Sequence, residues 1–290
     1  MTGIDTGATG PPAGAHGGAG AYGLEFNGLT RETEALIGTS SVDDPPVQVA
    51  VVDSSGVAEA TQVYIDAHRA HLLLAEGMVT IDRAPVLTVT FALGRHLSGE
   101  ALVHPYLAFP AAVISSWLGR PALHAGAFVN GDSAVGVMAD KAGGKSSTMA
   151  CIARGGGEVL TDDLLVLNTG CALAGPRAVD LREDVAAQFA CRHLGIVGAR
   201  ERWRISLPGC RPRARLRAIV ALAWSDRLMV ESLPVGERVR RLIDACALGP
   251  GRIEPGGLME LATLPMWLVS RPRDLGCLDE VVELMYSVTN

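Results

Sequence analysis

The stretch of sequence that decides the fold is Val135-Gly136-Val137-Met138-Ala139-Asp140-Lys141-Ala142-Gly143-Gly144-Lys145-Ser146. It fits the Walker A pattern of phosphate-binding loops (P-loops): glycine or alanine, four residues, Gly-Lys, then serine or threonine. An apolar strand over residues 135–138 precedes the loop, and a helix is predicted over residues 145–154, ending at Gly155. Small loop residues let backbone N–H groups curve around a phosphate, and the N-terminus of the following helix favours an anion.

Lysine is confined to this loop. The 25 basic residues of the chain include only two lysines, Lys141 and Lys145. Arginine is a rigid planar fork and lysine a compact charge on a flexible stem, so a position that keeps lysine here needs the ammonium itself. The alternative is a chance match in a chain with 34 glycines. Ala139 replaces the usual first glycine and fits only if its φ is not strongly positive.

We therefore expect the loop to bind a nucleotide. Lys145 would bridge the β- and γ-phosphates, and the Ser146 hydroxyl would hold Mg²⁺. The residues expected to line the nucleotide site are Ala139, Asp140, Lys141, Ala142, Gly143, Gly144, Lys145, Ser146 and Ser147.

An acidic pair, Asp162 and Asp163, follows the predicted helix inside the apolar segment 158–167. Carboxylates buried in a strand need a cation or hydrogen-bond donors, and adjacent strand residues point to opposite faces, so the two cannot easily share one partner. Lys145 and a metal ion would satisfy them, one aspartate binding Mg²⁺ and the other accepting the proton of an attacking hydroxyl. The alternative is a turn with solvated carboxylates and a new strand from Leu164.

The pattern of elements around the loop predicts an α/β fold. Strands at 123–129, 135–138 and 158–167, with the helix between the last two, are typical of a βαβ unit with a parallel strand pair. Strands are predicted at 216–224 and 228–233, and helices at 235–248 and 278–288. Upstream, strands at 47–52, 71–74, 78–81 and 86–92 precede a mostly helical segment at 101–118. We divide the chain into a disordered glycine-rich tail (1–23), a β-rich region with a helix at its end (24–120) and the loop-bearing domain (121–290).

Composition narrows the function classes. With 290 residues, 48% of them hydrophobic and 19% charged, the chain can bury a core and is not disordered throughout. The most apolar stretch, 102–118, is interrupted by His104 and two prolines and is shorter than the roughly 20 residues of a membrane span, so no membrane association is expected. No signal peptide is visible, which favours a cytoplasmic protein. Six cysteines without a C-x-x-C pair argue against a zinc site or disulfide framework. A net charge of −6 gives no sign of nucleic-acid binding.

Two arginine stripes alternate along the C-terminal half: Arg200, Arg202 and Arg204, then Arg211, Arg213, Arg215 and Arg217. A spacing of two places each set on one face of an extended segment. Such a face could bind the γ-phosphate or an acidic substrate segment, because arginine suits bidentate anion recognition. The alternative is a solvated sheet edge that charge protects against aggregation.

In order and spacing, these motifs resemble the catalytic domain of HPr kinase/phosphorylase, and most closely its shorter relatives in bacterial peptide-modifying pathways, the lasso-peptide kinases among them. The resemblance covers residues 123–167. His124 lies 21 residues before Lys145, and Asp162 lies 17 after it. The resemblance implies a P-loop core of the HPr kinase/phosphoenolpyruvate-carboxykinase-like type, with residues 121–290 as the kinase-like domain.

The resemblance also implies an activity: ATP- and Mg²⁺-dependent transfer of the γ-phosphoryl group to a hydroxyl, preferably a serine of a small peptide or protein, otherwise a small molecule. Lys145 and Ser146 would bind phosphate and metal, Asp162 and Asp163 would supply a second metal ligand (Asp162) and the base, and His124 would assist near the phosphoryl group. Arg211 or Arg213 is the nominee for a functional arginine, with Arg177 and Arg182, which are nearer the acidic pair in the sequence, as alternatives. HPr kinases form hexamers, so a homo-oligomer is possible.

Several alternatives stay open. His124 could be a satisfied core histidine. Residues 175–182 lack the glutamate-containing signature loop of the true HPr kinases, which argues against HPr as the substrate and against phosphorylase activity. That departure, together with Ala139, leaves room for a nucleotide-binding regulatory or scaffold protein without phosphotransfer. A carboxykinase is disfavoured by the short chain.

Overall fold

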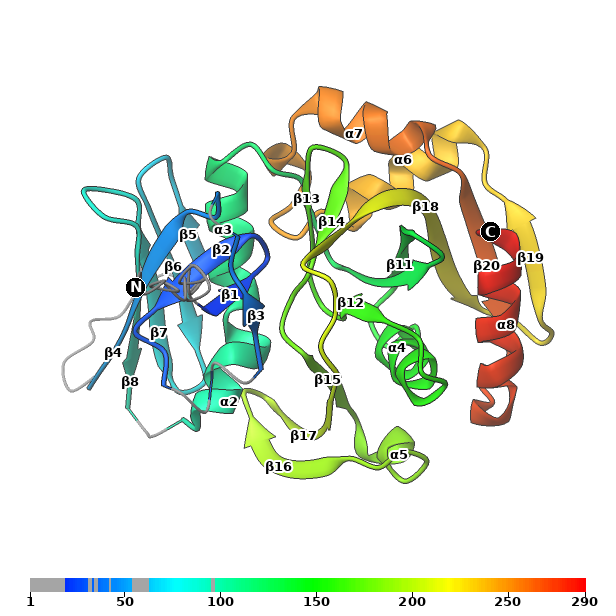
Figure 1. Ribbon diagram of the computed structural model, residues 1–290, viewed down its shortest axis with the longest axis horizontal. Coiled ribbons are helices and arrows are strands. Elements are labelled where there is room, and N and C mark those ends of the chain that lie inside the picture. The colour runs from blue at the N-terminus through cyan, green and yellow to red at the C-terminus, as the bar shows by residue number, and fades with distance from the viewer. Residues whose placement is uncertain (1–18, 31–32, 34–35, 42, 54–62, 95–96) are drawn as a thin grey trace, which may run out of the picture.

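The computed structural model describes residues 19–30, 33, 36–41, 43–53, 63–94 and 97–290. Two β-sheets lie on either side of a central helix, α3 (Ala108–Trp117), and a small third sheet lies below them in the view of Figure 1. No helix in these ranges is both long and apolar enough to cross a membrane.

The first sheet belongs to the N-terminal part and has the spatial order β3-β1-β2-β4-β8-β7-β6-β5. Its strands are β1 (Ala19–Ala21), β2 (Leu24–Asn27), β3 (Gly38–Thr39), β4 (Pro46–Asp53), β5 (Val63–Ile65), β6 (Arg69–Leu74), β7 (Gly77–Asp82) and β8 (Thr88–Leu93). Val89, Phe91 and Leu93 of β8 are buried, whereas the residues between them are half-buried. This period of two is the pattern of a sheet with one face on the core, and the four strands predicted upstream of residue 101 are confirmed.

The helix predicted over residues 101–118 is correct only in its second half. The chain forms the single turn α2 (Gly99–Ala101) and the segment Leu102–Tyr106, then α3. His104, with φ −140° and ψ 119°, interrupts the helical path because a residue before proline is pushed into extended backbone. Helix α3 is apolar on most sides because it packs between the first two sheets. This packing explains why residues 102–118 are the most apolar stretch of the chain.

The second sheet carries the Gly-Lys-Ser loop and has the order β12-β10-β11-β18-β14-β13-β9, extended by β20 and β19 beyond β18. Its strands are β9 (Ala122–Leu123), β10 (Ala125–Asn130), β11 (Ser133–Ala139), β12 (Val159–Thr161), β13 (Leu165–Asn168), β14 (Cys171–Leu173), β18 (Arg213–Trp224), β19 (Met229–Ser232) and β20 (Met266–Arg271). Helices cover both faces: α6 (Val235–Asp244) and α7 (Pro255–Thr263) on one, α4 (Lys145–Arg154) and α8 (Leu278–Val288) on the other.

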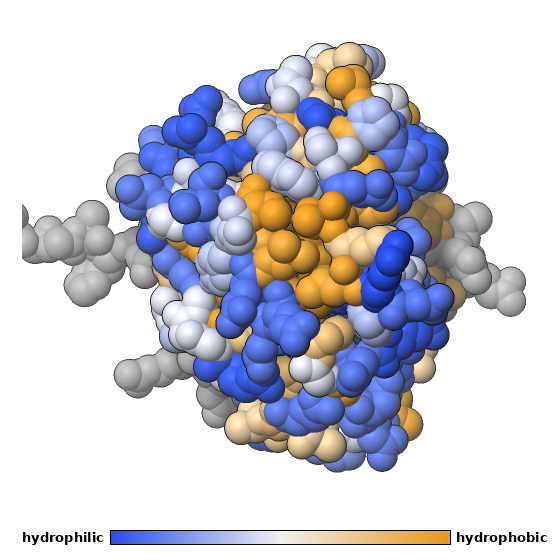
Figure 2. Space-filling model, turned by 90° about the vertical axis from the view of Figure 1, so that its right-hand side faces the viewer, coloured by the Kyte–Doolittle hydropathy of each residue, from blue (hydrophilic) through white to orange (hydrophobic). Residues whose placement is uncertain are grey.

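Alternation along the central strands produces this layering. Ile219 and Ala221 of β18 pack with α6 and α7, whereas Val220 and Leu222 pack with α4 and α8. The mixed α/β class is confirmed, as are α4 and α8 with their predicted bounds; α6 ends earlier than predicted. At the end formed by β19 and α8, apolar side chains gather at the centre of the face (Figure 2), and Met229 and Val230 of the edge strand β19 are exposed.

Two predictions about the segment after α4 are wrong. Strands β11 and β12 do not pair directly, because β10 lies between them and is antiparallel to both; the parallel partner of β11 is β18. Residues 158–167 are two strands, since β12 stops at Thr161 and β13 starts at Leu165. The Thr161 hydroxyl donates to the carbonyl of Leu164 at 2.9 Å and so closes the turn that contains the acidic pair.

The boundary of the predicted tail is also wrong. Residues 1–18 lie outside the described part, but β1 begins at Ala19, and Tyr22 is almost fully buried. The backbone N–H of Tyr22 donates to the carbonyl of Ala174 at 2.6 Å, which joins the start of the first sheet to the loop after β14. Burial and the nearby Asp163 carboxylate raise the pKa of Tyr22 well above its usual value.

The third sheet, β15 (Ala178–Leu181), β17 (Arg200–Ser206) and β16 (Arg192–Val197), holds a buried ion pair. Arg204 donates to both carboxylate oxygens of Asp180, at 2.8 and 2.9 Å, and to the carbonyls of Glu100 and His104, at 2.8 and 2.5 Å. The short helix α5 (Glu183–Ala186) follows β15. Arg204 therefore fixes the segment around His104 to the third sheet.

This arrangement predicts unequal effects of removing two arginines that lie close together. Arg204→Met leaves the buried Asp180 carboxylate with only the longer contact to Arg202 at 3.3 Å, so it should lower the free energy of unfolding by about 3 kcal/mol, the lower end of the cost of breaking a buried ion pair. Arg192→Met removes only the exposed ion pair with Glu100 and should cost about 1 kcal/mol or less. Urea unfolding of both variants measures the difference; equal losses would show that the Arg204–Asp180 pair is not a structural anchor.

Candidate active site

The loop between β11 and α4 fits its sequence without strain at Ala139. Ala139 is the last residue of β11, pairs with Leu222 of β18 and has no positive φ. The left-handed positions are Ala142 (φ 63°) and Gly144 (φ 86°). Alanine in place of the usual first glycine therefore imposes no backbone cost, which removes one of the two reasons for considering a nucleotide-binding protein without phosphotransfer.

Helix α4 presents an uncapped N-terminus to this loop. Gly144 is the residue before the helix, with no side-chain cap and no acidic residue in the first turn. The first N–H groups of a helix lack intrahelical acceptors and carry partial positive charge, so they are suited to bind an anion such as a phosphate. Asp140, Lys141 and Ala142 are exposed at the loop tip, whereas Lys145 is buried.

The ammonium of Lys145 is the centre of the site. Nζ donates to the main-chain carbonyl of Asp162 and lies 3.4 Å from Oδ1 of Asp162 and 3.5 Å from Oδ1 of Asp163. The two carboxylates share this partner, contrary to the expectation from strand geometry, because the chain turns at this point. The alternative of a turn between two strands is confirmed, but the solvation it predicted is wrong for Asp162, which is 2% exposed.

These three charges shift one another's pKa values. Burial opposes the ammonium of Lys145, but the two carboxylates outweigh it and raise its pKa. Burial also raises the pKa of Asp162, partly offset by Lys145. Asp163 is half-buried, which opposes its charge, yet Lys145 and the neighbouring histidines and arginine lower its pKa below the usual value. Lys145 is thus held as a cation and Asp163 as an anion.

His124 lies at the edge of this cluster. It connects β9 to β10, its backbone N–H donates to the carbonyl of Ala245 at 2.6 Å, and its side chain is exposed. It is therefore not a buried core histidine. Packing around the ring and the positive charge of Lys145 lower its pKa below 6.5, so it is neutral at pH 7 and able to accept a proton.

A second histidine, His104, was missed by the sequence analysis. It is 2% exposed, neither ring nitrogen has a hydrogen-bond partner among the described residues, and Nε2 lies 3.5 Å from Oδ2 of Asp163. The signal was present in the sequence as a histidine directly before a proline in an otherwise apolar run. Only the fold could show that this residue meets residues 162 and 163.

His104, Asp162 and Asp163 could hold a divalent cation. Their donor atoms lie within 4.8 Å of one another, and Oδ2 of Asp162 is buried with no hydrogen-bond partner in the part of the chain that the structure describes. Each carboxylate directs Oδ1 toward Lys145, which leaves Oδ2 for a cation. The Ser146 hydroxyl lies close enough to Asp162 to favour its charged form, so the predicted metal ligands Ser146 and Asp162 are adjacent.

The structure does not place Arg211, the arginine predicted to be functional, at the acidic pair. Arg211 binds Glu158 through its backbone N–H (2.6 Å) and its guanidinium (3.0 Å). Glu158 precedes β12 and Asp162 follows it, so four residues of extended chain, roughly 13 Å, separate Arg211 from the acidic pair. Arg213, Arg215 and Arg217 are solvent-exposed along β18, but the alternative of a sheet edge is wrong, because this part of β18 pairs with β11 on one side and β14 on the other.

The other stripe points inward. Arg202 and Arg204 of β17 are buried on Asp180, and Arg202 contributes to the lowered pKa of Asp163. A further arginine, Arg271 at the end of β20, stacks over the Trp224 ring at 4.4 Å and donates to the carbonyl of Gly144 at 3.4 Å. Its buried Nε has no partner among the described residues, so Arg271 is a cation available to a ligand at the loop.

Comparisons with known proteins add little to this geometry. No family model and no curated protein matches the chain. Among solved structures, the HPr(Ser) kinase/phosphatase from Coxiella burnetii is similar, with 13% sequence identity, coverage of 58% of this chain and 96% of that chain, and a TM-score of 0.29. What the chain does therefore has to be inferred from its own residues.

Replacing the buried lysine should make stability depend on pH with a definite sign. Without Lys145, burial raises the pKa of Asp162 further, so the folded state binds a proton that the unfolded state releases. Stability then rises as the pH falls towards the folded pKa. We expect Lys145→Met to be more stable near pH 5 than near pH 8 in urea unfolding. Lys141→Met, at the exposed loop tip, should keep the wild-type profile, and parallel profiles would contradict the proposed burial.

The cation site predicts metal binding without a nucleotide. MnCl₂ should raise the melting temperature of the free protein, by the equivalent of about 2.7 kcal/mol at 100 times Kd. MgCl₂ should do less, because an imidazole nitrogen suits Mn²⁺ better than Mg²⁺. His104→Gln should abolish the Mn²⁺ shift, whereas His193→Gln, whose side chain is exposed beside Glu201, should retain it. An unchanged shift in His104→Gln would refute the site.

Proposed function

We propose that this protein is an ATP- and Mg²⁺-dependent kinase that transfers the γ-phosphoryl group to a hydroxyl, preferably a serine of a peptide or protein. The observation that carries the proposal is a lysine at the first turn of a helix, after a short glycine-containing loop, held between two carboxylates. Phosphoryl transfer depends on positioning and on stabilising charge, and this arrangement supplies fixed charges of both signs.

The loop would bind the phosphates as a P-loop does. The uncapped N–H groups of α4 would surround the β-phosphate, with Lys145 moving between the carboxylates and the γ-phosphate. Arg271, beside Gly144, would add a second positive charge on the nucleotide side. Ser146 and Asp162 would hold Mg²⁺, with Oδ2 of Asp162 as the free ligand atom, and the bound ion would neutralise charge on the β- and γ-phosphates.

The acceptor hydroxyl is best placed at Asp163. Its side chain is 23% exposed, against 1% for Asp162, so it is the carboxylate that a substrate can reach. Its lowered pKa keeps it ionised, and an ionised carboxylate accepts the hydrogen bond of the hydroxyl and then its proton. His124, neutral and exposed beside it, would receive or relay that proton.

A nucleotide-binding regulator remains the second candidate only because the signature glutamate is missing. Its other basis, Ala139, is removed by the unstrained strand geometry at that residue.

The test is transfer from ATP with Mg²⁺ to peptides encoded beside the gene, followed by intact mass. A gain of about 80 Da is expected with the wild type. Asp163→Asn should reduce the rate about 10²–10⁴-fold and Lys145→Ala at least 10²-fold. Lys141→Ala should lose far less, because that side chain is exposed. ATP binding without any mass gain would favour the regulator, and full transfer by Lys145→Ala would refute the assignment of the transfer to this loop.

A further inference from the structure

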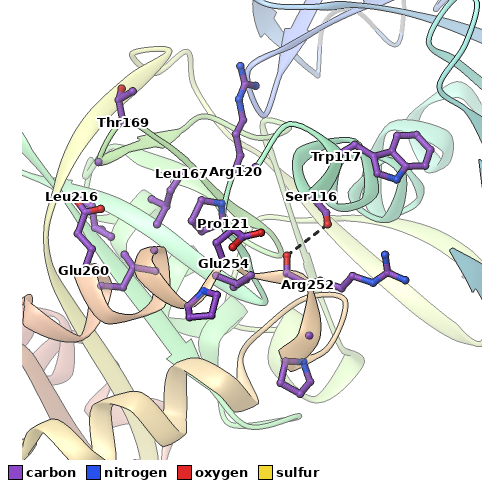
Figure 3. Close-up of a pocket in the computed structure, with 18 of the residues that line it drawn as sticks. Ser116, Trp117, Arg120, Pro121, Leu167, Thr169, Leu216, Arg252, Glu254 and Glu260 are labelled. Carbon is purple, nitrogen blue, oxygen red and sulfur yellow. Dashed lines mark hydrogen bonds between the residues drawn. The ribbon is translucent and has the colours of Figure 1, made fainter. Parts of the chain in front are cut away.

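A cavity of about 1020 Å³ lies apart from the candidate active site (Figure 3). Its walls come from the first sheet, the C-terminal end of α3, the β13–β14 hairpin, β18 and the segment that leads into α7. Lys145, Asp162, Asp163 and both candidate histidines are not among its lining residues. The volume is at the upper end of the range for ligand pockets, so it can accommodate more than a small metabolite.

Four arginines line this cavity without a carboxylate partner. Arg83 donates to the carbonyls of Ala67 and Trp117, both at 3.3 Å. Arg120 donates to the carbonyl of Gly23, and Arg252 to that of Ile65, each at 2.9 Å. Arg215 is exposed, and none of the four forms a salt bridge with a described residue. Carbonyl partners hold three guanidinium groups in place but do not neutralise them.

The acidic residues of the wall do not balance these cations. The lining has three carboxylates against these four arginines. Asp66 stays ionised, because the Tyr64 hydroxyl (2.5 Å) and the backbone N–H groups of His68 and Arg69 (both 2.7 Å) that donate to it carry no charge. Glu254 and Glu260 are the other carboxylates of the lining. The wall is therefore positive on balance in a chain whose net charge is −6.

The uncharged part of the lining is mainly apolar, with Ser116, Thr169 and Thr263 as polar exceptions. Pro121, Leu167 and Leu216 form part of one wall, and Trp117 lies at the end nearest Arg252 (Figure 3). Guanidinium groups around an apolar surface suit a ligand that has both negative charges and apolar groups. A polypeptide segment with acidic and apolar side chains has this character, and arginine binds carboxylates bidentately.

Two paired strands connect the cavity with the active site. In β9 and β13, Leu123 pairs with Leu165 and Ala122 with Val166. One end of this pair leads to His124 and Asp163, and the other end reaches Pro121 and Leu167 in the cavity wall. At about 3.3 Å per residue, the two places are roughly 10–13 Å apart along the strands. An extended peptide could therefore occupy both if at least about four residues separate its two contact points.

We propose that this cavity binds an acidic, partly apolar segment of the polypeptide acceptor and so selects the chain whose hydroxyl reaches Asp163. The identification of the bound segment as part of the phosphoryl acceptor rests on the proposed kinase function. The binding of the segment to the cavity does not require catalysis. The segment recognised lies at least about four residues from the phosphorylated side chain.

The test uses the full chain and a phage library of random dodecapeptides. Peptides selected on the wild-type protein without nucleotide are synthesised with a fluorescein label, and their affinities are measured by anisotropy at low salt. We expect enrichment in Asp and Glu. Arg215→Glu/Arg252→Glu should weaken binding at least tenfold. The matched control, Arg213→Glu/Arg217→Glu, makes the same charge change at exposed residues of β18 outside the lining and should bind within about twofold of wild type.

Each other outcome has a definite meaning. No enrichment, selected peptides without excess acidic residues, or equal binding by the two double variants would overturn the proposal; thermal unfolding checks that both variants are folded. Lys145→Ala should bind the selected peptides like wild type. Peptide binding as expected without any phosphoryl transfer would leave the cavity assignment standing and refute the kinase function. Transfer to peptides whose KM is the same in both double variants would refute only the cavity assignment.

Discussion

The structure depends on a buried lysine that must have carboxylates, and on buried carboxylates that must have a cation. Neither Lys145 nor Asp162 can be taken out of water alone without a large cost in free energy. For the two residues to meet, the first turn of α4 has to lie in space beside the last residue of β12. Strand β12 also has to stop at Thr161, so that the turn after it directs both carboxylates to the same side. The break in the strand is therefore the condition for the ion cluster.

The cluster is completed by residues far away in the sequence. His104 comes from the segment before α3, and Tyr22 from the beginning of the first sheet. Arg204 binds Asp180 and the carbonyl of His104, so the third sheet determines where that imidazole lies. The N-terminal part thus places a buried histidine beside the acidic pair, so residues from both parts of the chain form the candidate active site.

Strands β9 and β13, where the two parts of the chain meet, run between the candidate active site and the cavity. Strands β9 and β13 are short, and each leads from the cavity wall to a residue of the acidic cluster. Helix α3 ends at the cavity and packs its apolar length against the core behind the site. A polypeptide acceptor that contacts the junction would touch surfaces from both sheets, and its specificity would then be determined by the pairing of the two parts rather than by the glycine-containing loop.

The sequence by itself determined the local features. It predicted the loop at residues 139–146, helices α4 and α8 with their bounds, the mixed α/β class and the approach of Lys145 to the acidic pair. These features were predictable because spacing, small residues and hydrophobic periodicity act over a few residues. Only the tertiary structure decided that β10 lies between β11 and β12, that His104 and not Arg211 approaches the acidic pair, and that the inner arginine stripe is on β17. Strand order and the meeting of residues about 60 positions apart depend on how whole layers pack, and local patterns carry no record of that packing.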